Sequence, residues 1–135
     1  KIMGYRSEVH IAVPKKDEVE LDAIMNEHDL LEGDYPAFTK EDYTQRWNKY
    51  NDNNEMIEET TKFVIYYGGH LKWYEGYKDV DAVTSFIMDK IYDCCDDNNG
   101  EGGRTMVCVG EDNAIHSEVG DYYEIFNINM VVELQ

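Results

Sequence analysis

Alternation of apolar and polar residues predicts a first strand over residues 5–13. Its apolar face holds Tyr5, Val9, Ile11 and Val13. Its polar face holds Arg6, Glu8 and His10. Pro14 follows and is expected to end the strand.

Two later stretches have apolar residues at helical spacing, and we expect helices over 17–31 and 79–96. Asp17 offers an N-cap to the first, with Glu20 three residues on, and Gly33 ends it. The first apolar stripe contains Leu21, Ile24, Met25, His28 and Leu31. The second, which follows Asp79, contains Val80, Val83, Ile87, Ile91 and Cys94.

The middle of the chain predicts a short helix and then a hairpin. Tyr43, Trp47 and Tyr50 have i, i+4, i+7 spacing, so we expect a helix that the Asn-rich run 51–54 terminates. Residues 61–67 and 70–77 are rich in β-forming side chains, and the intervening Gly68-Gly69 is typical of a two-residue hairpin turn. The uncharged face, which we expect to be buried, contains Val64, Tyr66, Leu71 and Trp73.

Two strands, over 105–109 and 122–134, complete the expected elements, with 110–120 as a loose connection or a further short strand. The order is β-α-(α)-β-β-α-β-β. We therefore predict one α+β domain over residues 1–135, with a mainly antiparallel sheet and two principal helices on one face. The ferredoxin-like arrangement with an added strand is the nearest common solution.

Composition narrows the classes of function. The chain has 29 Asp+Glu against 12 Lys+Arg, a formal net charge of −17, so direct binding to nucleic acid or anionic lipid is disfavoured. Aromatic residues make up 13%, which indicates a folded core despite the charge. No apolar run is long enough to span a membrane, and residues 1–6 lack the apolar stretch of a signal peptide. The three cysteines, an odd number, indicate a reducing compartment, so the expected location is the cytoplasm.

The spacing of the cysteines predicts neither a redox centre nor a metal site, and the four histidines show no paired ligand spacing. Cys94, Cys95 and Cys108 are odd in number and lack the spacing of zinc or redox pairs, so we interpret them as buried apolar residues. The loop that begins at Asp97 matches the start of an EF-hand, but Cys108 stands where a bidentate Glu is required. We expect no metal and no cofactor.

One polar group of residues is a candidate ligand site. If the first strand neighbours the hairpin, their polar side chains share the helix-free face, where they could bind a small anion or nucleotide or transfer a proton. Cross-strand polar pairing on an open sheet is the alternative interpretation. The residues are Arg6, Glu8, His10, His70, Lys72 and Tyr74.

The acidic residues are unevenly distributed. Between Asp17 and Asp34 there are eight carboxylates and no base, and between Asp93 and Glu124 there are nine carboxylates and one base. Carboxylates three or four residues apart on a helix lie ~5–6 Å apart at Cβ, close to the spacing of DNA phosphates. Such a surface suits a basic groove; generic acidity for solubility is the competing interpretation. The residues chosen for partner binding are Glu18, Asp22, Asp29, Asp89, Asp93, Asp96 and Asp97, with Tyr43 and Trp47 as apolar anchors.

The opening Met3-Gly4-Tyr5-Arg6-Ser7-Glu8-Val9 resembles the start of small bacteriophage-encoded proteins of unassigned function. In size, charge and compactness the chain is also similar to phage DNA-mimic inhibitors of host defence, such as anti-restriction and anti-CRISPR proteins. This similarity implies a non-enzymatic protein that blocks a basic nucleic-acid-binding enzyme of a host. A small-ligand-binding or enzymatic domain is the alternative, and a subunit that pairs edge strands with another copy is a third.

Overall fold

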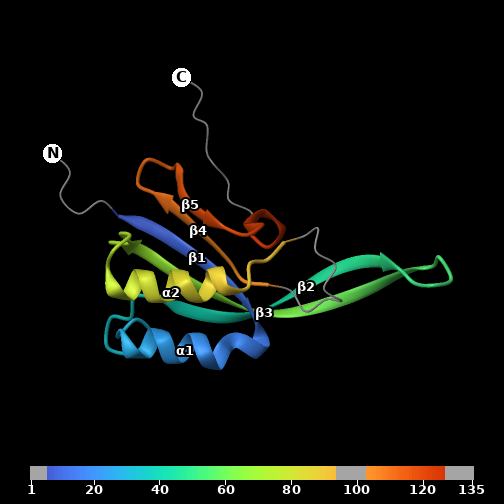
Figure 1. The fold of residues 1–135 in the computed structure, drawn as a ribbon, viewed down its shortest axis with the longest axis horizontal. Coiled ribbons are helices and arrows are strands. Elements are labelled where there is room, and N and C mark those ends of the chain that lie inside the picture. The colour runs from blue at the N-terminus through green and yellow to red at the C-terminus, as the bar shows by residue number, and fades with distance from the viewer. Residues whose placement is uncertain (1–5, 94–102, 127–135) are drawn as a thin grey trace, which may run out of the picture.

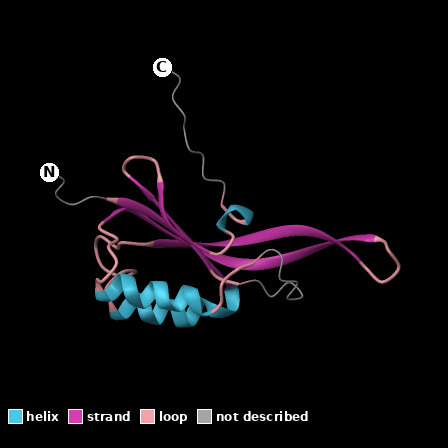
Figure 2. Cartoon of the chain, turned by 45° about the horizontal axis from the view of Figure 1, so that its top comes forward, coloured by secondary structure: helices cyan, strands magenta, loops and turns pink. Residues whose placement is uncertain are grey.

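The computed structural model describes residues 6–93 and 103–126. They form a five-stranded antiparallel sheet in the order β2-β3-β1-β4-β5, with two helices against one face (Figures 1 and 2). The strands are β1 (Ser7–Pro14), β2 (Thr39–Tyr50), β3 (Met56–Leu71), β4 (Thr105–Gly110) and β5 (Ile115–Val119). The helices are α1 (Glu18–Glu27) and α2 (Lys78–Asp89), with the 3₁₀ turns η1 (Lys15–Asp17) and η2 (Tyr122–Glu124).

The connectivity confirms the expected α+β class. α1 joins β1 to β2 and α2 joins β3 to β4, and β1 and β3 lie side by side in the middle of the sheet. This is the β-α-β-β-α-β order of ferredoxin-like folds, with β5 added beside β4. The apolar face of β1 packs against the helices as the alternation predicted. The core contains Val9, Ile11, Val13, Leu21, Met25, Val83 and Ile87.

Residues 42–50 are not helical, and the sequence prediction was wrong there. They belong to β2, which pairs with β3 in unbroken register from Thr39↔Tyr67 to Tyr50↔Met56. Both faces of β2 are largely exposed, so the sequence shows no period-two apolar pattern. The spacing of Tyr43, Trp47 and Tyr50 imitated a helical stripe, whereas the partner strand decides the conformation.

Gly68-Gly69 is not a hairpin turn, a second correction. β3 runs through both glycines to Leu71, and the register against β1 shifts so that Gly69 and His70 together oppose Glu8. This is a β-bulge. Within it His70 adopts a left-handed backbone conformation, with a φ of +59°. The face predicted to be buried does face the core: Val64 and Tyr66 are buried, and Leu71 and Trp73 pack against the core.

Other elements end earlier than predicted. α1 stops at Glu27, where Asp29 adopts a positive φ, and α2 stops at Asp89. Residues 122–124 form a 3₁₀ turn instead of the start of a strand, while 127–134 lie outside the described residues. Part of the 110–120 connection forms β5, the further short strand considered as one possibility.

A long two-stranded arm extends from the sheet (Figures 1 and 2). β1 pairs with β3 only from Phe63 onward, so residues 44–50 and 56–62 pair with each other alone. We call residues 44–62 the arm. At its tip the Asn51 side chain accepts hydrogen bonds from the N–H groups of Asn53 and Glu55, each at 2.9 Å. The Asn-rich run therefore forms a turn, as predicted.

A buried ion pair joins η1, α2 and β4. The Arg104 Nε donates to Asp17 Oδ2 at 3.0 Å, and the two side chains are only 4% and 9% exposed. Arg104 Nη1 also donates to the Phe86 carbonyl at 2.7 Å, and the guanidinium lies 3.7 Å from the Phe86 ring centroid. Asp17 precedes α1 as predicted, but its side chain binds Arg104 and does not cap the helix.

Candidate functional site

The eight carboxylates between Asp17 and Asp34 divide into two groups. Asp17, Glu18 and Asp22 have partners inside the molecule. The other five are exposed and have no hydrogen bond or ion pair through their side chains to any described residue. We call these five the acidic surface: Glu20, Glu27, Asp29, Glu32 and Asp34.

Glu18 and Asp22, two residues chosen for partner binding, bridge α1 to the sheet. Lys40 Nζ on β2 donates to both carboxylates, at 2.9 Å to Glu18, and Lys15 lies 2.9 Å from Glu18. Hydrogen bonds from Lys40 and then Lys15 lower the pKa of Glu18, while those to Asp22 and Glu18 raise the pKa of Lys40. Asp22 also accepts from the Tyr66 hydroxyl at 2.7 Å. Their charges are therefore largely compensated within the chain.

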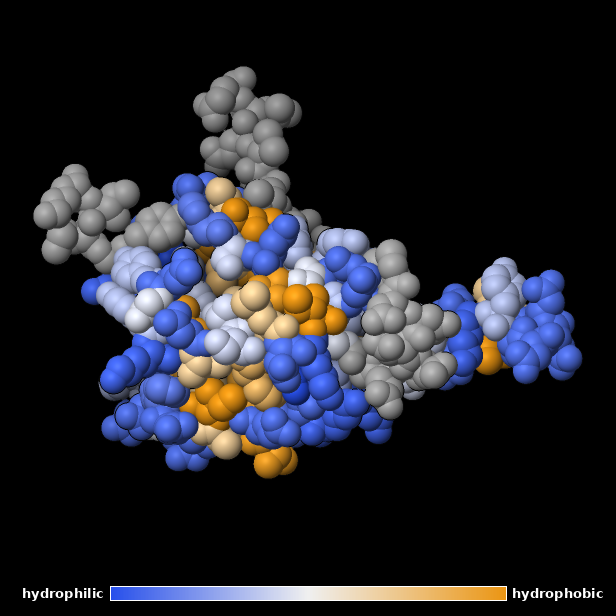
Figure 3. Space-filling view, in the orientation of Figure 1, coloured by the Kyte–Doolittle hydropathy of each residue, from blue (hydrophilic) through white to orange (hydrophobic). Residues whose placement is uncertain are grey.

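Two exposed apolar side chains accompany the acidic surface. Val19 lies beside Glu20 on α1 and is 79% exposed, and Tyr35 follows Asp34 and is 97% exposed. The view onto the helices shows apolar side chains set among hydrophilic ones (Figure 3). An exposed aromatic ring beside charged residues is common where one protein binds another. Sequence reasoning missed Tyr35 because a lone tyrosine in a loop carries no periodic signal.

The other residues predicted to bind a partner lie outside the acidic surface, apart from Asp29. Asp89 and Asp93 are exposed near the end of α2, and Asp89 Oδ2 is 3.9 Å from the buried Arg104. Tyr43 and Trp47 are on β2, and the Trp47 indole N–H donates to Thr61 Oγ1 at 3.1 Å. Asp96 and Asp97 lie outside the described residues. Of the chosen acids, Asp29 alone belongs to the acidic surface.

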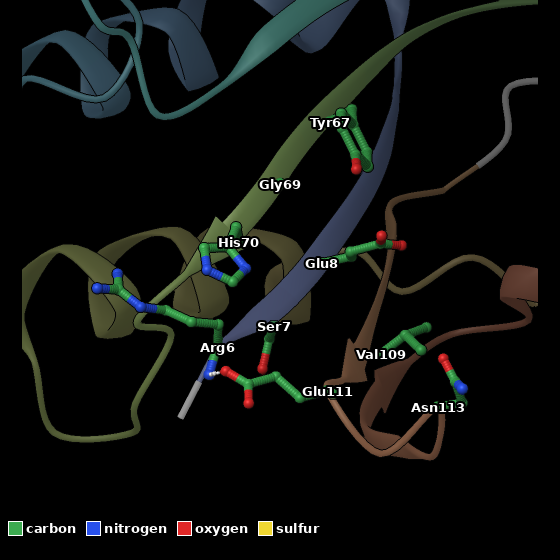
Figure 4. Close-up of a pocket in the computed structure, with 10 residues that line it drawn as sticks. Arg6, Ser7, Glu8, Tyr67, Gly69, His70, Val109, Glu111 and Asn113 are labelled. Carbon is green, nitrogen blue, oxygen red and sulfur yellow. Dashed lines mark hydrogen bonds between the residues drawn. The ribbon is translucent and has the colours of Figure 1, made fainter. Parts of the chain in front are cut away.

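The candidate ligand residues are partly brought together in a second place. A pocket of about 310 Å³ opens where β1 begins, beside the β3 bulge and the β4–β5 turn (Figure 4). Three predicted residues, Arg6, Glu8 and His70, line it. The residues that the sequence did not indicate are Ser7, Tyr67, Gly69, Val109, Gly110, Glu111 and Asn113.

Backbone geometry shapes this pocket. The bulge places both Gly69 and His70 opposite Glu8, which turns the imidazole toward the pocket's rim. The Arg6 backbone N–H donates to Glu111 Oε1 at 2.6 Å, which fastens the β4–β5 turn to the start of β1. The Arg6 side chain extends past His70 and away from Glu8 (Figure 4). The lining therefore mixes one guanidinium, one imidazole and two carboxylates.

His10 lies beyond Glu8 on the same strand face but does not line the pocket. Its ring packs between Tyr67 and Phe126, with centroid distances of 5.0 and 5.5 Å. Burial lowers the pKa of His10, and the Glu8 carboxylate 3.7 Å away opposes that shift only in part. Burial and then Glu8 raise the pKa of the Tyr67 phenol. His10 is thus held mainly neutral at neutral pH.

Lys72 and Tyr74 do not join the pocket. They follow the end of β3, and the Tyr74 ring instead packs edge-on against Tyr77 at 5.4 Å. The prediction relied on a turn at Gly68-Gly69, which would have folded residues 70–77 back along the sheet. Because β3 continues through the glycines, these two side chains leave the shared face.

The cysteines and the metal-ligating side chains add no further site to the acidic surface and the pocket. Cys108 is buried in β4, as predicted, and burial raises the pKa of its thiol to about 12. Cys94 and Cys95 lie outside the described residues. Within 6–93 and 103–126, no three His, Cys, Asp or Glu side chains are grouped to hold a metal ion. Nor does that part of the chain contain a helix of the length and apolarity needed to cross a membrane.

No protein-family model, curated protein or solved structure matches the chain.

Proposed function

We propose that the chain is a non-enzymatic binding protein whose acidic surface occupies a basic, nucleic-acid-binding groove of a partner protein and blocks it. One observation carries the proposal: five exposed carboxylates without described partners lie on α1 and the following loop, in a stretch that contains no base. The neighbouring acids are already neutralised by Lys15, Lys40 and Arg104.

The division of the acids supports a specific surface over generic acidity. If charge served solubility alone, the surplus could be spread evenly among the bases, and a small domain needs a net charge of only about 2–8. Here α1 uses its sheet-facing acids for ion pairs and leaves Glu20 and Glu27 exposed. These two are seven residues apart, two helical turns, and so lie on one side of the helix.

The opposite charge of the partner follows from electrostatics. A net charge of −17 accelerates association with a basic surface and repels nucleic acid itself. Tyr35 supplies the apolar contact that charge alone lacks, because buried aromatic side chains dominate many interface energies. The phage origin and the host-defence enzyme suggested by the sequence belong to this proposal as the setting in which such blocking is useful.

The test compares two variants of equal charge. The first carries E20Q, E27Q, D29N, E32Q and D34N. The matched control carries D52N, E55Q, E58Q, E75Q and E118Q, five exposed acids outside the acidic surface. Binding of each immobilised chain to a panel of purified nucleic-acid-binding proteins is measured at several salt concentrations.

We expect the first variant to lose binding and the control to retain most of it. Affinity of the unmodified chain should fall steeply with salt, because exposed charges are screened over about 8–10 Å. Equal losses in both variants would show that total charge, not this surface, is responsible. Full retention in the first variant would refute the proposal.

A second candidate is favoured by the pocket of Figure 4, which Arg6, Glu8 and His70 line. Its mixed charges suit a small polar ligand. If R6A and H70A abolish the biological effect of the protein while the acidic-surface variant keeps it, ligand binding in the pocket is favoured over the first function.

A further inference from the structure

We propose that the chain forms a symmetric dimer in which the β2 strands of two copies pair antiparallel about a twofold axis at Gln45. β2 is an edge strand: among the described strands it pairs only with β3, so its other side presents unpaired backbone N–H and C=O groups. The inference is independent of the acidic surface.

Natural edge strands are usually shortened, bulged or interrupted by proline to prevent pairing. β2 has none of these three protections, and only its charged side chains, among them Lys40 and Lys49, oppose pairing. It runs for 12 residues without proline or glycine, and its register against β3 contains no bulge. The opposite edge strand, β5, has only five residues and an irregular register against β4. β2 is therefore the edge that is built to accept another strand.

The arm needs additional support. Residues 44–50 and 56–62 form only a two-stranded ribbon, and such a ribbon is marginally stable in water. Tyr50 and Met56 are paired at its tip and are 68% and 64% exposed. With the axis at Gln45, residues 44–50 of each arm would lie beside residues 40–46 of the other copy's β2, which adds a third strand along the open edge of the ribbon. The arm extends beyond the helices, which leave its β2 edge open (Figure 2), whereas residues 40–43 of β2 lie beside α1, where Lys40 binds Glu18 and Asp22.

Charge makes β2 the place where two such acidic chains can meet. Two copies with a charge of −17 each repel one another. β2 nevertheless has three bases against two acids, Lys40, Arg46 and Lys49 against Glu41 and Asp42. Lys40 is paired with Glu18 and Asp22, and Lys49 with Glu59, so the strand is not a cationic surface. It nevertheless lacks the run of unpaired acids found on the acidic surface, so repulsion between copies is weaker along it.

The residues of β2 are also self-complementary in this register. With the axis at Gln45, Glu41 lies opposite Lys49 of the second copy and Tyr43 lies opposite Trp47. Symmetry produces each pair twice. Opposite-charge and aromatic cross-strand pairs are both stabilising. An axis at Arg46 would place two guanidinium groups opposite each other, and an axis at Thr44 would separate Tyr43 from Trp47.

Charge reversal tests the register by analytical ultracentrifugation over a range of concentrations. E41K and K49E each replace two attractive contacts by two repulsive ones, so we expect dimer affinity to fall by about tenfold or more. An equimolar mixture of the two variants restores both contacts and should dimerise, as should the double variant E41K/K49E. Controls are E58K and K62E, the same charge changes at exposed arm positions on β3, which should keep the dimer.

Far-UV circular dichroism of every variant checks that the fold is intact, because K49E also removes the 3.0 Å contact of Lys49 with Glu59. A wild-type chain that stays monomeric at the highest soluble concentration would overturn the proposal. So would a dimer that E41K and K49E leave unchanged, or a mixture of them that stays monomeric.

Discussion

Replacing Asp17 by asparagine should destabilise the fold severely. The side chain keeps its size but loses the charge that Arg104 faces at 3.0 Å in a nearly water-free position. Removing one member of a buried ion pair costs about 3–5 kcal/mol, because the other charge stays buried without compensation. Asp89, 3.9 Å away and 76% exposed, replaces little of that compensation.

The magnitude is large for a domain of this size. Small domains unfold with about 5–15 kcal/mol in total, so D17N should remove about a fifth or more of the free energy of unfolding. The melting temperature should fall by roughly 10–20 °C. Urea denaturation followed by circular dichroism measures the loss directly, and E20Q, a surface change one turn along, should stay within about 0.5 kcal/mol of wild type.

The double variant D17L/R104M provides a further check. It removes both charges, so it should lose less stability than D17N despite two substitutions. A D17N cost below about 1 kcal/mol, the value for an exposed pair, would refute the view that η1, α2 and β4 are joined by a buried charge.

Two other predictions concern the sheet. Gly68→Ala should cost about 1–3 kcal/mol in urea denaturation, because a Cβ there would lie 2.5 Å from Leu71 Cδ1 and 2.8 Å from the Phe38 ring; a cost near zero would show that Phe38 moves aside. His10→Gln should flatten the pH dependence of stability just below pH 6.5. The native pKa of His10 lies below its ordinary value of 6.5, so the unfolded chain takes up a proton first and the wild type loses stability as pH falls through this window. Parallel curves for wild type and His10→Gln would contradict the buried, neutral imidazole.

The fold class could be predicted because period and propensity agree in the body of the molecule. Val9, Ile11 and Val13 alternate with polar residues, and the helix stripes contain Leu21, Met25, Val83 and Ile87, all of which are buried. The predicted order of elements agrees with the observed one only because two errors offset each other: the hairpin expected over 61–77 is the single strand β3, and the expected helix that carries Tyr43 is its partner β2. The errors fall where no core imposes a pattern: the arm, exposed on both faces, carried only an accidental helical spacing.

The glycine pair shows a different ambiguity. Gly68-Gly69 permits either a turn or a bulge, and the choice depends on β1, which pairs along the whole of this region. The sequence predicted only some of the residues that line the pocket, because the others are brought there by tertiary structure. Arg6 and Glu8 were correctly placed by alternation, whereas Glu111 and Asn113 join them through a turn whose path the sequence does not specify. The pairing of Glu18 and Asp22 with Lys40 likewise needs tertiary structure.

Competition with DNA tests the central claim most directly. A nucleic-acid-binding protein retained by the immobilised chain is titrated with duplex DNA, and release of that protein is followed. If the acidic surface occupies the DNA groove, DNA should release the partner from the immobilised chain completely. Any partner still retained by the variant neutralised at Glu20, Glu27, Asp29, Glu32 and Asp34 should be released at far lower DNA concentrations. A stable ternary complex of the partner, the chain and DNA would contradict the claim.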